Sequence, residues 1–568
     1  RDIGVTGVQT CALPIWVSTT RADGDIVLTA RIIRTVNPSQ PTANAIRLRE
    51  GRVLAVGSLD DCMAWGAATV DRQFENLVLT AGFVEAHAHV MAGMYSTLTY
   101  VGRFPRLMPD GEMLDGVGST DELIERLRSV EVALNPGDPL LCSGFDPIYF
   151  DTDRLSRRHL DAVTSTRPIF VLHASGHLAT VNSFVLDKYG LDRNHTAPGL
   201  GKDDDGEPNG ELREPAAMML ARDEFTGIGA IVQSPATFSA FADSMRNAGV
   251  TTSTDLANQW WRSPDILDSR RTTAEDDSFP VRVVVASQIN ASLDAMTKLA
   301  ETVDTLRASQ HTKLLFPIVK LVLDGSIQGF TAMIDWPGYF TGDDHGQFLV
   351  PPEQVVDLLR PFHERNIGIH CHCNGNLTSG VFIDAVEQLL TERAWLDHRH
   401  TITHAQLMTH AQMRKARNLG MQANFFVNHM WFWGDQHRSV TVGPDRADHL
   451  NACATADRIG LGYSIHTDAP VTPPGHLHTM WAAVNRVSPS GRVLGESERI
   501  SVDRAFHAVT IDAAYQLHLD HVIGSLEVGK WADITVLHED PYEVDPVRIR
   551  DIKVWGTVVG GTIHRNPA

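Results

Sequence analysis

Eight short apolar runs, separated by stretches long enough for helices, constrain the fold of this chain more than any other feature. From the second run onward, the intervals match about one strand–helix unit each, which is typical of a (β/α)8 barrel of the TIM type. The first interval is far longer and predicts a large insertion at about residues 95–240. The runs lie at 76–87, 251–257, 281–289, 316–325, 367–373, 400–406, 421–427 and 462–469.

Both ends of the chain show strand-like alternation of apolar and polar residues. The segments 25–36 and 43–57 near the start have this pattern, and so do 532–540 and 552–564 near the end. Residues 17–78 and 510–568 are therefore expected to form one small β-sandwich subdomain. The barrel is expected to occupy residues 79–509.

The first sixteen residues are interpreted as a non-native artefact. They contain no initiator Met, no basic region and no apolar core of a signal peptide, and GVQTCALPI resembles translated adapter sequence. Without a targeting signal, the expected location is cytoplasmic. No run approaches the 18 apolar residues of a membrane span, and the formal charge of −20 disfavours nucleic acid and anionic membranes as partners.

Residues that bind metals or carry charge lie at the ends of five predicted strands. Functional groups of such barrels belong at the C-terminal ends of the strands, so these side chains are expected to converge. Histidines one residue apart share a face of a strand and can bind one ion together. The residues are His87 and His89 in the first run, Lys320 in the fourth, His372 in the fifth, His404 in the sixth and Asp468 in the eighth.

Some of these choices leave alternatives open. His370 shares a strand face with His372, so it is the second choice for that position. Cys371 and Cys373 point to the other face, where core packing competes with a thiolate site. An ordinary buried histidine remains the alternative for His404, and a loop cap remains the alternative for Asp468.

Several motifs together resemble metal-dependent amidohydrolases, in particular the amidohydrolase 3, or YtcJ-like, group. The resemblance covers nearly all of residues 25–562. Departures lie beside the expected ligands, as at Glu85, Asn376, Thr403 and Thr467. The motifs are AGFVEAHAHV (81–90), SGHLATVNS (175–183), DGEPNGELRE (205–214), VKLVLDGS (319–326), HCHCNGN (370–376), RHTITHAQ (399–406), HTDAPV (466–471) and GSLEVGKWADITVLHEDPY (524–542).

The resemblance implies a divalent metal, expected to be zinc, held by the four histidines and Asp468. Asp468 is expected to be the catalytic proton carrier as well. Lys320 can bridge a second ion only if it is carboxylated, so one or two ions are expected. Four further residues are expected to bind substrate: His177 and Asn182 in the insertion, Asp324 beside Lys320, and Trp433 in an aromatic wall.

These features predict a hydrolase in which activated water attacks a carbonyl and cleaves a C–N bond of a small amide, formamide or cyclic amide. A deaminase or an ester or carbamate hydrolase on the same scaffold is the alternative, followed by a metal-binding barrel without turnover. The motifs GxSxG, GxxxxGK[ST], GxGxxG and HExxH are absent from the sequence, which disfavours serine hydrolases, nucleotide enzymes and thermolysin-like proteases. A homodimer is a further expectation, because such barrels often pair.

Overall fold

A parallel sheet of eight strands forms the centre of the molecule. The computed structural model describes residues 24–150, 154–289, 293–342 and 345–567. Each strand falls within one of the eight predicted runs or overlaps it closely, so the prediction of eight parallel strands is confirmed. The strands, in sheet order, are β6 (Phe83–Glu85), β15 (Val250–Asn258), β16 (Arg282–Gln288), β17 (Leu314–Val322), β18 (Gly368–Cys373), β19 (Thr401–His404), β20 (Gln422–Phe425) and β21 (Tyr463–Ile465).

The sheet curls so that its first and last strands approach each other at their C-terminal ends. Just beyond β6 and β21, Ala88 and Ala469 form an isolated parallel bridge. The N–H of His89 donates to the carbonyl of Ala469 at 2.8 Å, and the N–H of Asp468 donates to the carbonyl of His87 at 3.0 Å. The loop that contains His87 and His89 is thereby joined directly to the loop that contains Asp468.

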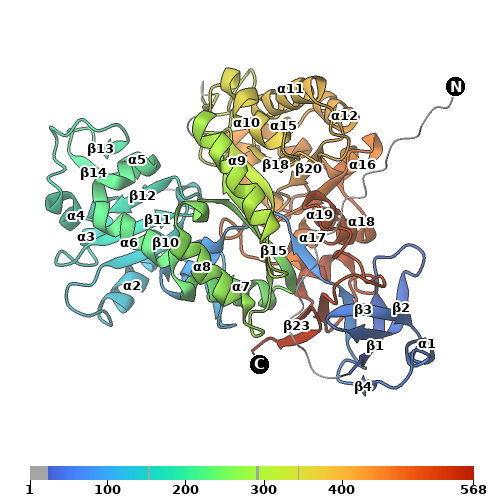
Figure 1. The fold of residues 1–568 in the computed structure, drawn as a ribbon. Helices are drawn as coiled ribbons and strands as arrows, with labels where there is room; N and C mark the ends of the chain where they lie inside the picture. Colours follow the sequence, from blue (N-terminus) through green and yellow to red (C-terminus); the bar gives the residue numbers. More distant parts are fainter. Residues whose placement is uncertain (1–23, 151–153, 290–292, 343–344, 568) are drawn as a thin grey trace.

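Helices cover the outer face of this sheet (Figure 1), and the main apolar core lies between the two layers. Cys371 and Cys373 belong to that core, because alternation along β18 turns their side chains away from the barrel interior. The covering helices are α7 (Pro235–Asn247), α8 (Pro264–Glu275), α9 (Leu293–Ala308), α10 (Val355–His363), α11 (Asn376–Glu392), α12 (His410–Leu419), α16 (Cys453–Ile459), α17 (His476–Asn485) and α18 (Val502–Ala508). A further helix, α19 (Ile511–Gln516), packs in a separate apolar core with Val84, Ala286 and Ile318 on the other face of the sheet.

Loops and short helices follow the C-terminal ends of the strands. Apart from the chain between β6 and α7, the longest connects β17 to α10 and contains the 3-10 turn η5 (Pro352–Gln354). The connection after β20 is largely helical. Its elements are α13 (His429–Phe432), α14 (Gly434–Gln436), the π-helical turn η6 (His437–Thr441) and α15 (Gly443–His449).

The chain between β6 and α7 builds a separate mixed sheet, the left-hand lobe of Figure 1. We call this lobe the insertion. Its six-stranded sheet has the order β13-β14-β12-β11-β10-β7, and it encloses its own apolar cores. The strands are β7 (Thr99–Tyr100), β10 (Leu140–Phe145), β11 (Ile169–His173), β12 (Leu178–Val181), β13 (Leu200–Lys202) and β14 (Pro208–Arg213), with the hairpin β8 (Arg106–Leu107) and β9 (Met113–Leu114). The helices are η1 (Val90–Ser96), α2 (Thr120–Glu131), η2 (Pro147–Tyr149), α3 (Arg157–Asp161), α4 (Ser183–Lys188), α5 (Glu214–Met218), η3 (Met219–Ala221) and α6 (Arg222–Gln233).

Strands from both ends of the chain share one sheet with the order β24-β23-β22-β5-β1-β2-β3, in which β4 also pairs with β1. Its division into the two layers of a sandwich stays a prediction, and so do the domain boundaries. The elements are β1 (Ile26–Arg34), β2 (Thr42–Arg49), β3 (Arg52–Gly57), α1 (Leu59–Met63), β4 (Thr69–Asp71), β5 (Val78–Ala81), β22 (Ile534–Leu537), η8 (Pro546–Asp551), β23 (Val554–Val559) and β24 (Thr562–Arg565).

None of the helices in the described ranges has the length and apolar character needed to cross a bilayer. The sixteen residues interpreted as an artefact lie outside the described residues.

Candidate metal centre

The six residues predicted to form the metal site all line one cavity of about 490 Å³ at the C-terminal ends of the barrel strands. They come from three different strands, β17, β18 and β19, and from the two loops that follow β6 and β21. Segments nearly 400 residues apart in the chain therefore contribute to one wall. These residues are His87, His89, Lys320, His372, His404 and Asp468.

The carboxylate of Asp468 lies at the centre of this group. Its Oδ1 is 3.2 Å from Nε2 of His89 and 3.4 Å from Nε2 of His87, and its Oδ2 is 3.9 Å from Nδ1 of His404. Asp468 and His404 have φ values of +53° and +69°, in the left-handed region that such residues seldom occupy. Strain of this kind is found at functional sites, because surrounding structure must hold it in place.

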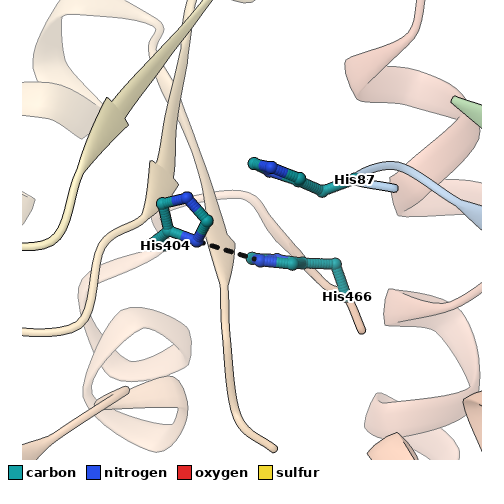
Figure 2. A group of neighbouring side chains, drawn as sticks. All are labelled: His87, His404 and His466. Atoms are coloured by element: carbon teal, nitrogen blue, oxygen red, sulfur yellow. Dashed lines mark hydrogen bonds between the residues drawn. The ribbon is translucent and has the colours of Figure 1, made fainter. Parts of the chain in front are cut away.

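His466 joins the cluster although the sequence analysis assigned it no role. Figure 2 shows its ring beside those of His87 and His404, and Nε2 of His466 lies 3.2 Å from Nδ1 of His404. Nδ1 of His466 contacts Oδ1 of Asn424 at 2.7 Å. The signal was present in the sequence, since His466 precedes Asp468 by two residues, the spacing at which side chains share a face of a predicted strand.

Two histidines have their Nδ1 occupied by acceptors. Nδ1 of His89 donates to the carbonyl of Leu256 at 2.8 Å, and Nδ1 of His372 donates to Oδ1 of Asp324 at 3.0 Å. Because these acceptors hold the proton on Nδ1, the lone pair lies on Nε2 in the neutral ring. This tautomer is the one that binds a metal through Nε2.

Asp324 holds His372 in position and does not line the cavity. The carboxylate is fully buried and accepts hydrogen bonds from the N–H groups of Met333, Asn374 and Gly375 and from the hydroxyl of Thr378. The structure therefore places this residue behind the predicted ligand, and not against substrate as the sequence analysis expected. With its oxygens so engaged, Asp324 is a rigid support for the imidazole.

The structure separates the two alternatives on β18. His372 lines the cavity, whereas His370 is buried deeper in the barrel, with Nε2 3.4 Å from the carbonyl of Gln516. On the opposite face, burial raises the pKa of Cys373 well above that of an ordinary thiol. A thiolate ligand from this strand is therefore disfavoured.

Lys320 is buried in β17, where its Nζ donates to the hydroxyl of Thr403 at 2.6 Å. Burial lowers the pKa of Lys320 to about 8, although the nearby carboxylate of Asp468 acts in the opposite direction. Burial also lowers the pKa values of His87 and His404 well below the ordinary value. Neutral imidazoles are the form that coordinates a metal.

Three buried atoms of this cluster have no hydrogen-bond partner among the described residues: Nδ1 of His87, Nε2 of His404 and Oδ1 of Asp468. Unsatisfied buried polar atoms are costly, and a cation gives both the nitrogen of His404 and the oxygen of Asp468 a partner. Imidazole nitrogens with one carboxylate form a donor set that suits zinc and related divalent ions. The residues present therefore fit a metal ion.

Of the remaining residues predicted to bind substrate, only His177 lines this cavity, and its Nδ1 lies 3.0 Å from Oε2 of Glu214. Asn182 is fully buried, where it caps α4 and donates to the carbonyl of Arg167. The indole of Trp433 is buried, and its Nε1 donates to Asp146 at 3.0 Å. The structure therefore places Asn182 and Trp433 in supporting positions, away from the cavity wall.

Comparisons with known proteins show the family of this chain and the likeness of its fold. The chain is 24% identical to the putative amidohydrolase YtcJ of Bacillus subtilis, covering 91% of this chain and 95% of that protein. It is 23% identical to the N-substituted formamide deformylase of Arthrobacter pascens, covering 95% and 98%. Its fold matches an uncharacterized metal-dependent hydrolase from Pyrococcus horikoshii with a TM-score of 0.70 and 18% identity, covering 92% and 99%. The sequence model of the Amidohydrolase family matches residues 74–564, and this chain belongs to that family.

Proposed function

We propose that this protein hydrolyses a C–N bond of a small amide, with a formamide as the first class to test. The observation that carries the proposal is the convergence of Asp468 with His87, His89 and His404 on one cavity, with a carboxylate oxygen and an imidazole nitrogen left unpartnered. A purely structural cluster gains nothing from leaving buried polar atoms unsatisfied.

The histidines and Asp468 would hold the ion, which we propose to be zinc. The ion supplies an acidified water and polarises the substrate carbonyl. Asp468 would accept the proton of the attacking water and return it to the leaving nitrogen, because its carboxylate faces the cavity from the centre of the group. The pKa of Asp468 is lowered: burial raises it, but the close contact with His89 and the positive charge of Lys320 act in the opposite direction and outweigh that effect. The carboxylate is therefore ionised and able to accept a proton at neutral pH.

The choice of bond is supported by the relative named as a formamide deformylase, which spans nearly the same length as this chain. A deaminase on the same scaffold is the second candidate, and a solved adenosine deaminase with bound zinc matches this fold at a TM-score of 0.52. The two candidates differ in their products. Hydrolysis of an N-substituted formamide releases formate and an amine, whereas deamination releases ammonia.

The test combines metal analysis with product analysis. Protein purified without chelator should contain about one or two divalent ions per chain by elemental mass spectrometry, and should release formate from N-substituted formamides. Ammonia release from ring amidines without formate release would favour the deaminase. Metal binding without turnover on either series would favour a non-catalytic barrel.

A further inference from the structure

A second cavity, of about 450 Å³, adjoins the one that contains the predicted metal ligands. Its wall comes from the insertion and from the loop after β17. Four residues line both cavities, namely His173, Ser175, His177 and Glu214. These four residues therefore lie at the boundary between the two cavities, and we call this boundary the throat. The space beyond the throat is large enough for a substantial part of a small molecule.

Two of the residues that line the second cavity each have a buried polar atom without a hydrogen-bond partner among the described residues. Nε2 of His173 contacts the hydroxyl of Thr180 at 2.9 Å, but its Nδ1 is unpartnered. The second atom is Oε1 of Gln328, a side chain that is 8% exposed. An atom of this kind carries a desolvation penalty until a ligand supplies its partner. The second cavity is thus polar and prepared for a hydrogen-bonding group.

Glu214 brings a negative charge to the throat. It is the first residue of α5, it has a strained φ of +68°, and it lines both cavities. Only one of its carboxylate oxygens is bonded within the described residues, to His177. Asp146 adds a second carboxylate to the wall of the second cavity.

Two arginines, Arg154 and Arg213, also line the second cavity, and both are already paired with a carboxylate. Arg154 and Arg213 both donate through Nε to the buried carboxylate of Glu211, and both side chains are more than half exposed to water. An ion pair that faces water attracts a further ligand only weakly. The group favoured at the throat is therefore a cation with N–H donors.

We infer that the second cavity binds the far end of an extended amide substrate, and that this end carries an ammonium group. Glu214 and Oε1 of Gln328 accept its N–H donors, while the amide passes through the throat to the predicted metal ligands. A carboxylate at the same place would face Glu214 and Asp146. The inference rests on the proposed function for the position of the reacting carbonyl, but binding of the far end does not require turnover.

Calorimetric titration of the metal-loaded protein tests this binding without catalysis. The probes are the N-methylureas of hexylamine, hexanediamine and aminohexanoic acid. They share a six-carbon chain, differ in the group at its far end, and resist hydrolysis. The hexanediamine probe should bind at least about tenfold more tightly than the hexylamine probe, and the carboxylate probe should bind least tightly. Equal affinities, or tightest binding of the carboxylate probe, would overturn the inference.

Variants locate the binding site. Glu214→Gln and Gln328→Met keep the side-chain volume, and each should reduce the advantage of the hexanediamine probe to about threefold or less. Ser175→Phe narrows the throat and should weaken all three long probes relative to dimethylurea. Ser129→Phe on the exposed face of α2 is the matched control and should leave the four affinities unchanged.

Thermal melting of each variant separates loss of binding from loss of folding. If folded Ser175→Phe and Gln328→Met proteins bound the long probes as the wild type does, the second cavity would not be the binding site. Hydrolysis is measured separately. A screen without any amide cleavage would contradict the proposed function, while the calorimetry would still decide the role of the second cavity.

Discussion

Asp324 lies behind His372, with Oδ1 accepting the Nδ1 proton of the imidazole at 3.0 Å and both carboxylate oxygens bonded to further donors. This contact directs Nε2, the other ring nitrogen of His372, away from Asp324. Asp324→Asn would replace one acceptor oxygen with a donor and disturb the network. We expect metal affinity to fall by roughly 10–100-fold. Competition with a chromogenic chelator measures this loss. Asp384→Asn, at an exposed position on α11, should leave metal affinity unchanged.

Asp468→Asn tests the proton carrier. The amide keeps the size of the side chain but cannot accept the proton of the attacking water, so kcat should fall by at least roughly 10²–10⁴-fold. KM should change much less, since the cavity wall remains. Steady-state kinetics at equal metal content provide the measurement. Activity near that of the wild type would contradict the assignment.

Lys320→Ala tests whether this buried lysine supports a second ion. If the lysine is carboxylated, the variant should contain about one ion fewer per chain than the wild type, and added bicarbonate should not restore the ion. Elemental mass spectrometry counts the ions. Lys415→Ala, at a partly exposed surface lysine on α12, is the control. Equal metal content in Lys320→Ala and the wild type would make Lys320 an ordinary buried lysine.

The ion pair between Arg282 and Asp533 should contribute strongly to the joint between the barrel and the terminal sheet. It is bidentate, at 2.6 and 2.9 Å, and both side chains are buried. Asp533→Asn leaves the guanidinium buried without its full counter-charge, so the free energy of unfolding should fall by about 3–5 kcal/mol. Glu543→Gln, in the exposed pair with Arg31, should lower it by less than about 1 kcal/mol. Chemical denaturation compares them, and equal losses would contradict the prediction.

Asp146 should make stability depend on pH in acid solution. Burial raises its pKa to about 6, from about 4 in an unfolded chain, although hydrogen bonds from Ile148 and Trp433 oppose the shift. Between these values the folded protein retains a proton that the unfolded chain has lost. Stability therefore decreases as pH rises from about 4 to about 6, by about 3 kcal/mol, and this contribution is constant above that range.

Asp146→Asn removes this titration, so the melting temperature of the variant should fall less than that of the wild type between pH 4 and pH 6. Asp268→Asn, at an exposed position on α8, should follow the wild-type profile. Parallel profiles for the Asp146→Asn variant and the wild type would show that Asp146 titrates normally.

Much of the architecture could be predicted from periodicity alone. A strand buried on both faces needs a continuous apolar run, and a parallel connection needs a helix-length spacer, so the eight strands are visible in the chain. The cavity-lining positions of His87, His89, Lys320, His404 and Asp468 followed from the rule that strand ends converge.

Depth along a strand could not be predicted in the same way. His370 and His372 share a face because side chains alternate with a period of two, yet only His372 reaches the cavity. The register of β18 against β17 and β19 decides this difference, and register depends on hydrogen bonds between segments far apart in sequence.

The sequence by itself determined which residues could take part in the chemistry, through strand spacing and strand-end composition. The tertiary structure alone decided their neighbours: Asp324 behind His372, Asn182 and Trp433 away from the cavity, and Glu214 at the throat. The physical reason is that spacing along the chain is a local property. A contact such as that between Asp468 and His87 exists only after the curled sheet brings its two edges together.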